Sequence, residues 1–226
     1  MRQFVFKYLK YLFFWLLLFA FYRLLFIVVY HRLCIPDIGL AREALFAFFY
    51  ALKLDLSMMA YLAAIPMLIL LVWMFFPKRW LSKIIDGLTI INIIAYSFIA
   101  FGEIGIYNEW RTKLNYKALV YFQHPQEIFN STSTVTFFLL LAGALVLIAF
   151  WIWLYYRSFR YAKVELTAPW YFKTVFAVVI PMAMFYFMRG GFMTIPISQS
   201  QSWYSKNQAL NDAAVNSGWN LFQNII

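Results

Sequence analysis

Five long apolar stretches constrain the fold of this chain more than any other feature of its sequence. They cover residues 11–30, 56–76, 84–106, 134–156 and 166–188. A helix rises 1.5 Å per residue, so about 20 apolar residues cross the hydrocarbon layer of a bilayer. Lipid offers no hydrogen bonds to backbone N–H and C=O groups, whereas a helix satisfies these groups internally. We therefore predict an all-α integral membrane protein with five transmembrane helices.

The composition agrees with a membrane setting and argues against other classes of protein. Hydrophobic residues make up 65% of the chain and charged residues 12%, whereas a soluble domain is roughly half apolar and a quarter charged. The formal net charge is +10, but Lys and Arg lie in short clusters between apolar stretches, so we predict no nucleic-acid partner. Cys34 is the only cysteine, and His31 and His124 are isolated, so we predict no metal site in this chain.

The apolar stretches differ in how well they fit a membrane span. Arg23 interrupts the first, while Asp86 and Glu103 leave the third with only a short uncharged centre. The fifth holds Pro181, which predicts a kink, and the Gly-Gly pair at 190–191 marks its end. The third is therefore the weakest of the five predicted spans.

The positions of Lys and Arg between the spans predict the orientation of the chain. Basic residues in short loops are retained on the cytoplasmic side of a membrane. With the N-terminus in the cytoplasm, three basic clusters with few acidic neighbours fall on that side, at residues 2–10, 78–83 and 157–163. Five crossings then place the C-terminal segment on the extracytoplasmic side.

Two further segments are predicted to lie at the outer membrane surface. Joined to the second span, residues 38–53 would give one helix of roughly 58 Å, so we expect an interfacial helix there, a break near Asp55, and a new helix capped by Asp55 or Ser57. Residues 107–129 mix aromatic and basic side chains, which is typical of a second interfacial helix. Residues 189–226 are rich in Ser, Asn and Gln, and we expect them to form a linker in water.

Charged residues in or near the spans are the candidate functional residues. A charge inside a span is costly and usually faces a partner, so Arg23 is expected to pair with Asp55 or Glu103. A structural ion pair and a polar pocket for a lipid headgroup both fit this arrangement. A break between Lys53 and Asp55 would let both side chains point at one site. The candidate set is Arg23, Lys53, Asp55, Glu103, Arg111, Lys113 and Arg189.

The candidates near the third span have two interpretations. Arg111 and Lys113 could hold anionic phosphate groups, as basic residues at a membrane surface do. Balanced interfacial charges explain them equally well. The sequence contains no Gly-rich phosphate loop, no nucleophile elbow and no HExxH motif. It therefore predicts no catalytic residue and no cofactor site within this chain.

Several short segments carry a resemblance to a known family. They are Ala-Leu-Lys-Leu-Asp-Leu-Ser at 51–57, Asn-Glu-Trp at 108–110 with Lys-Leu-Asn at 113–115, Arg-Gly-Gly at 189–191 with Ile-Pro-Ile at 195–197, and the segment 210–221. In this order they resemble the membrane domain of the lipoteichoic acid synthase family, membrane-anchored enzymes of the alkaline phosphatase and sulfatase superfamily. The first segment is similar to that family's Gly-Leu-Arg-Phe-Asp-Leu-Ser before its second span.

The resemblance implies a protein of the bacterial cytoplasmic membrane with a large extracytoplasmic domain after the linker. That domain would carry a Thr nucleophile and a divalent metal, typically manganese. It would transfer phosphoglycerol or phosphoethanolamine from a phospholipid, or hydrolyse sulfate or phosphate esters. No residue of this chain matches its nucleophile or metal ligands. The expected role of the chain is thus a membrane anchor that helps to present an anionic phospholipid.

The alternative is a stand-alone multi-pass membrane protein, such as a small transporter or an assembly subunit. It is motivated by Arg23, Asp55 and Glu103, which lie within or near the predicted spans. Internal repeats, which many transporters show, are not evident in the sequence.

Overall fold

The computed structural model describes residues 2–115, 134–160, 169–192 and 195–225, and all regular structure in these ranges is helical. Five helices within them are long and apolar enough to cross a membrane. They are α1 (Arg2–Val29), α3 and α4 together (Leu40–Tyr50 and Leu52–Phe75), α5 (Arg79–Trp110), α8 (Thr134–Leu154) continued by the π-helix η1 (Tyr155–Phe159), and α9 (Trp170–Arg189). The predicted all-helical architecture with five candidate spans is confirmed.

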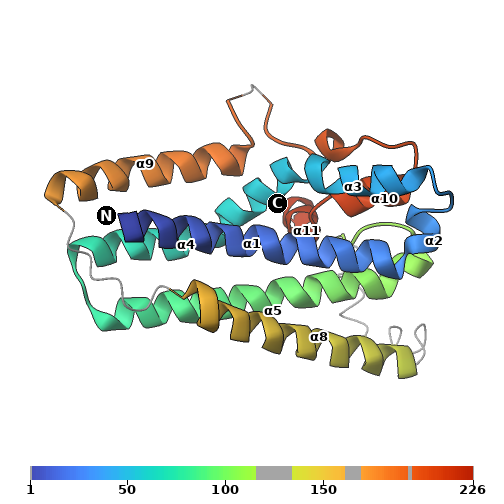
Figure 1. Ribbon diagram of the computed structural model, residues 1–226, viewed down its shortest axis with the longest axis horizontal. Coiled ribbons are helices and arrows are strands. Elements are labelled where there is room, and N and C mark those ends of the chain that lie inside the picture. The colour runs from blue at the N-terminus through green and yellow to red at the C-terminus, as the bar shows by residue number, and fades with distance from the viewer. Residues whose placement is uncertain (1, 116–133, 161–168, 193–194, 226) are drawn as a thin grey trace.

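The long helices run side by side along the longest axis of the molecule (Figure 1). α1, α4 and α5 contact one another and form the centre of the bundle. α9 packs along α4, and α8 packs along α5. These two flanking helices expose most of their apolar side chains, as expected for helices that face lipid.

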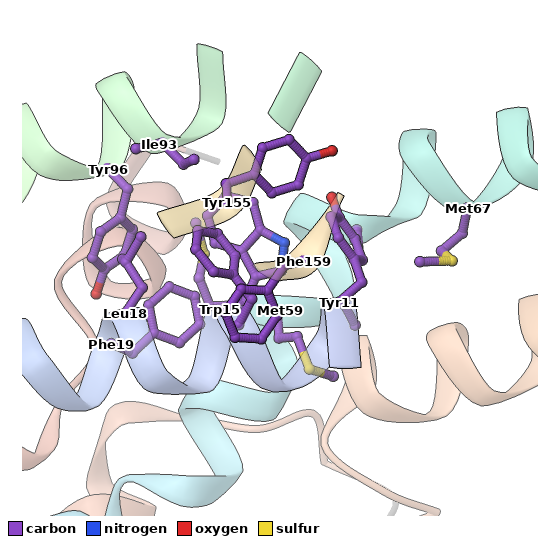
Figure 2. Close-up of a cluster of buried hydrophobic side chains, with 14 of the residues drawn as sticks. Tyr11, Trp15, Leu18, Phe19, Met59, Met67, Ile93, Tyr96, Tyr155 and Phe159 are labelled. Carbon is purple, nitrogen blue, oxygen red and sulfur yellow. The ribbon is translucent and has the colours of Figure 1, made fainter. Parts of the chain in front are cut away.

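An aromatic core fills the space between α1, α5 and η1. Tyr11, Trp15 and Phe19 lie four residues apart on one face of α1, and all three are buried. Figure 2 shows their rings gathered with those of Tyr96 and Tyr155. The Phe19 and Tyr96 ring centroids are 4.7 Å apart. Helices in lipid associate through close packing of this kind, because lipid tails are as apolar as the side chains themselves.

The helix break that was expected near Asp55 lies at Ala51 instead, so its predicted position is wrong. α3 and α4 meet at Ala51, whose backbone is itself α-helical (φ −71, ψ −24), and the Asp55 N–H donates to the Ala51 carbonyl at 2.9 Å. Asp55 therefore lies inside the first turn of α4, and neither it nor Ser57 caps a helix. Ala and Leu around this point are strong helix formers. Together α3 and α4 cover 36 residues, or about 54 Å of helix.

The third span, predicted to be the weakest, belongs to one of the longest helices. α5 extends over 32 residues and ends at Trp110, and the next residue, Arg111, adopts a left-handed conformation with φ 51. The two acidic residues of the predicted span, Asp86 and Glu103, are both paired, which removes the objection that the sequence raised. Of the predicted interfacial helix 107–129, residues 107–110 belong to α5, residues 111–115 form no helix, and the rest lie outside the described residues.

The fifth span is close to its prediction. α9 begins after Pro169, which occupies its N-cap position, and it contains Pro181 as expected. Gly190 ends it with φ 80, and its N–H donates to the Phe187 carbonyl at 3.1 Å. A Cβ at Gly190 would lie 2.4 Å from the Cβ of Ile197. Both the backbone angle and the close approach of the chain therefore require glycine here.

The C-terminal segment is not the solvated linker that its polar composition predicts. After Gly190 the chain turns back onto the bundle and forms η2 (Gln199–Ser202), α10 (Gln208–Ala214) and α11 (Ser217–Ile225). α10 contacts α1, α3 and the short α2 (His31–Cys34), and α11 contacts α4 and α5. The buried apolar residues of this segment are Ile197, Ala209, Leu210, Ala213, Ala214, Val215, Trp219 and Leu221. The expectation of a water-exposed tail is therefore wrong for α10 and the first half of α11.

Candidate functional site

Arg23 forms a two-pronged ion pair with Asp55 in the interior of the bundle. Its Nη1 and Nη2 donate to the two carboxylate oxygens at 2.9 and 2.8 Å, and its Nε donates to the Ala213 carbonyl at 2.9 Å. Arg23 is 6% exposed and Asp55 is 2% exposed. The side-chain amide of Asn216 also donates to Asp55, at 2.8 Å. This fork geometry is the strongest arrangement of an arginine and a carboxylate.

A second buried ion pair joins Lys113 to Glu103. The Lys113 Nζ lies 2.7 Å from Glu103 Oε1 and also donates to the carbonyls of Asp212 and Val215 at 2.9 and 2.8 Å. All three ammonium protons therefore have protein acceptors. The Ser217 hydroxyl donates to the same Glu103 oxygen at 2.9 Å. Lys113 follows the left-handed turn at Arg111, which directs the chain back toward α5.

The two ion pairs lie beside the same cavity. Arg23, Glu103 and Lys113 all line one cavity, together with Asn216 and Ser217 of the C-terminal segment. The prediction that Arg23 pairs with Asp55 is confirmed. Glu103, its other expected partner, instead pairs with Lys113. The charges of the four ionic side chains cancel, so the cluster satisfies the condition under which buried charges are tolerated.

The remaining predicted residues are not brought into this cluster. Lys53 and Arg111 are exposed, and Arg189 is exposed at the end of α9. Lys53 stands two residues before Asp55 on one uninterrupted helix, so the two side chains do not face each other. The site that a break between them would have formed is therefore absent from the described structure.

Asp212 is a functional candidate that the sequence reasoning missed. Its carboxylate accepts from the Tyr107 hydroxyl at 2.7 Å and from the Gln208 amide at 2.9 Å. Burial raises the pKa of Asp212, while the Tyr107 hydrogen bond and the charge of Lys113 oppose that rise. Asn216 and Ser217 were missed as well. Residues 207–220 contain many Asn and Asp side chains. This feature could have revealed the site, but it was interpreted as a sign that the segment lies in water.

A separate polar cluster lies along α5 at some distance from the first. Asp86 accepts from the Tyr155 hydroxyl at 2.9 Å and from Arg160 Nε at 2.8 Å. The hydrogen bond to Asp86 raises the pKa of Arg160 above its ordinary value. This cluster connects α5 to the end of η1. It explains how the second acidic residue of the third span is accommodated.

Apart from Glu103 Oε2, the carboxylate oxygens of the two ion pairs are bound by other side chains of the cluster. No group of three or more His, Cys, Asp or Glu side chains that could hold a metal ion occurs in the described ranges. The cluster instead connects four segments: α1 through Arg23, α4 through Asp55, α5 through Glu103, and the C-terminal segment through Asn216 and Ser217. These contacts hold the C-terminal segment against the bundle.

Comparisons with protein-family models, with curated proteins and with solved structures find no match for this chain.

Proposed function

We propose that this chain is a membrane domain that anchors an extracytoplasmic catalytic domain and holds the connecting segment in a fixed position. The observation that carries the proposal is the burial of the C-terminal segment by polar contacts. The Asn216 amide, the Ser217 hydroxyl and the carbonyls of Ala213 and Val215 all bind side chains from the bundle. A flexible tether needs no such contacts, whereas a rigid support does.

The resemblance to the lipoteichoic acid synthase family supports the choice of catalytic domain. That domain would act on a phospholipid or on sulfate or phosphate esters, with a Thr nucleophile and a divalent metal such as manganese. The N-terminus would lie in the cytoplasm of a bacterium and the C-terminal segment outside. Rigid attachment would keep the active site at a constant height above the outer leaflet, where a phospholipid headgroup lies.

Exposed basic residues support a part in presenting an anionic lipid. Ser57 donates to the Met188 carbonyl at 2.9 Å, which ties the start of α4 to the end of α9. Lys53 lies one turn before Ser57, and Arg189 follows Met188, so both exposed cations flank this contact. A headgroup phosphate at the same level would meet two positive charges. The buried Arg23 and Lys113 are excluded from this role because they lie inside the bundle, already paired with Asp55 and Glu103.

The simplest test of the anchoring proposal is to determine the coding sequence downstream of Ile226. We expect an open reading frame that continues into a domain with a Thr nucleophile and acidic and His metal ligands. A stop codon directly after Ile226 would refute the anchoring proposal. It would favour the stand-alone alternative, for which the buried Arg23–Asp55 pair within the spans is the motivating observation.

Lipid presentation needs its own test. The full-length protein is purified in detergent, and its bound phosphatidylglycerol is counted by native mass spectrometry against phosphatidylcholine. Lys53→Ala combined with Arg189→Ala should reduce phosphatidylglycerol binding several-fold without changing phosphatidylcholine binding. Lys83→Ala combined with Lys78→Ala is the matched control, since these two exposed cations precede or begin α5 at the opposite end. Equal losses in both double variants would show that binding reflects net charge alone.

A further inference from the structure

The cavity between the two buried ion pairs contains an acceptor without a protein donor. Glu103 Oε2 is buried and has no hydrogen-bond partner among the described residues, although Oε1 of the same carboxylate has two. Glu103 is 2% exposed. A buried carboxylate oxygen without a donor loses the hydration it has in water and gains nothing in return. Such groups in native proteins are usually satisfied by an ordered water.

The size of the cavity sets the size of its ligand. It leaves about 10 Å³ for the centre of a water-sized molecule, which is close to the smallest volume that holds one water. Its apolar wall includes Phe19 and Tyr96, whose adjacent rings are visible in Figure 2. A phosphate, a carboxylate or a hydrated cation needs more room. The ligand is therefore a single small polar molecule.

The hydrogen-bonding groups around the cavity set the chemistry of the ligand. Arg23 has five N–H groups, and three of them donate to Asp55 and Ala213. Each Nη therefore keeps one further N–H, and Arg23 lines the same cavity as Glu103. A water molecule can accept from such an N–H and donate to Glu103 Oε2. An added ion of either sign would leave an uncompensated charge in the interior, because the four ionic side chains already neutralise one another.

We propose that this cavity is a binding site for one water molecule, which accepts a hydrogen bond from Arg23 and donates one to Glu103 Oε2. The water joins the Arg23–Asp55 pair of α1 and α4 to the Lys113–Glu103 pair of α5. The two pairs then form one network with the C-terminal segment, in which Asn216 donates to Asp55 and Ser217 donates to Glu103. This site is independent of the proposed function, since it depends only on the cluster itself.

Water-edited solid-state NMR of the full-length protein in lipid bilayers tests the site. Magnetisation transferred from water should reach the Glu103 carboxyl carbon at least about twofold faster than the Asp55 carboxyl carbon. Asp55 is the matched control because it is equally buried and both of its oxygens have protein donors. Glu103→Gln and Asp55→Asn serve only to assign the two resonances. Equal build-up at the two carbons would overturn the proposal.

A second measurement uses the unaltered protein and does not depend on those variants. A density map at a resolution that shows ordered waters should contain one peak within hydrogen-bond distance of both Glu103 Oε2 and Arg23. A map with clear waters elsewhere and no peak at this position would refute the site. So would a map in which a protein donor occupies it, including one from residues 116–133.

Discussion

At the scale of single residues, this protein shows how charges are accommodated among apolar helices. Arg23, Asp55, Glu103 and Lys113 are each at most 6% exposed, yet each has at least one charged partner. The pairing compensates for the loss of hydration, which is several kcal/mol for an isolated buried ion. Removing one member leaves the other charge buried and uncompensated.

Arg23→Met should therefore lower the free energy of unfolding by about 3–5 kcal/mol, measured by chemical denaturation in mixed micelles. Adding Asp55→Leu should recover part of this loss, because the unpaired carboxylate is then removed. Recovery stays partial, since the Ala213 carbonyl and the Asn216 amide still lack their partners. Lys53→Met is the control, because Lys53 is exposed on α4, the helix that carries Asp55. A similar loss in Arg23→Met and Lys53→Met would contradict a buried ion pair.

A single hydrogen bond between α4 and α5 compensates for a proline. Pro66 has no N–H, so the carbonyl of Leu62 one turn earlier loses its helical donor. The Asn92 side-chain amide of α5 donates to that carbonyl at 3.2 Å. Asn92→Leu should cost about 0.6 kcal/mol, the average for such bonds within membranes.

A double-mutant cycle isolates the role of Asn92. In a Pro66→Ala background the helix itself supplies a donor to Leu62, and Asn92→Leu should then cost less than in the original chain. Denaturation midpoints of the four variants provide the coupling between the two positions. Strictly additive effects would show that Asn92 serves a purpose unrelated to Pro66.

At the scale of elements, the docking of α11 depends on one glycine. A Cβ at Gly218 would lie 2.9 Å from the Met58 Cε of α4 and 2.9 Å from the Tyr96 ring of α5. α11 therefore approaches both helices more closely than any other residue type permits. In Figure 1 this helix is seen nearly end-on, so it crosses the bundle instead of following its long axis.

Gly218→Ala should loosen α11 and expose the segment after Val215 to protease. Limited proteolysis is expected to cut this segment at least about tenfold faster than in the original chain, because local opening increases with the loss of local stability. Gly87→Ala is the control, since a Cβ there meets nothing within 4 Å. Unchanged cleavage in Gly218→Ala would mean that Met58 and Tyr96 move aside at no cost.

At the scale of the whole molecule, the burial of Cys34 decides which positions can report the predicted orientation in the membrane. Cys34 is fully buried, and burial raises the pKa of its thiol to about 11. The thiolate is the reactive form, and little of it exists at neutral pH. An impermeant maleimide should therefore leave Cys34 unlabelled in intact cells and label it only after denaturation.

Exposed positions can report the orientation instead. In a Cys34→Ala background, Ile38→Cys should be labelled in intact cells, because Ile38 is 94% exposed and is predicted to be extracytoplasmic. Lys78→Cys, also exposed, should be labelled only after the membrane is permeabilised. The reverse pattern would place the N-terminus outside and would reject the proposed attachment of an extracytoplasmic domain.

The amino-acid sequence by itself determined that the long apolar stretches are helices, and it determined the number of candidate spans. Apolar length is a local property, and in lipid it leaves the backbone no alternative to helix. The sequence also limited the expected partner of Arg23 to Asp55 or Glu103, because a charge within a span requires a partner, and the structure shows that Asp55 is that partner. The glycine end of α9 followed from the same kind of local signal.

Tertiary structure decided how the polar residues are used. A polar segment lies in water or inside the protein according to whether partners exist for its groups, and those partners come from distant parts of the chain. Asn216 meets Asp55 across 161 positions, and Lys113 reaches carbonyls at 212 and 215. No local sequence pattern predicts contacts between residues so far apart in the chain. The sequence of the C-terminal segment therefore predicts a solvated linker, whereas the segment packs as part of the bundle. The reason is that the bundle supplies the hydrogen-bond partners that water would otherwise provide.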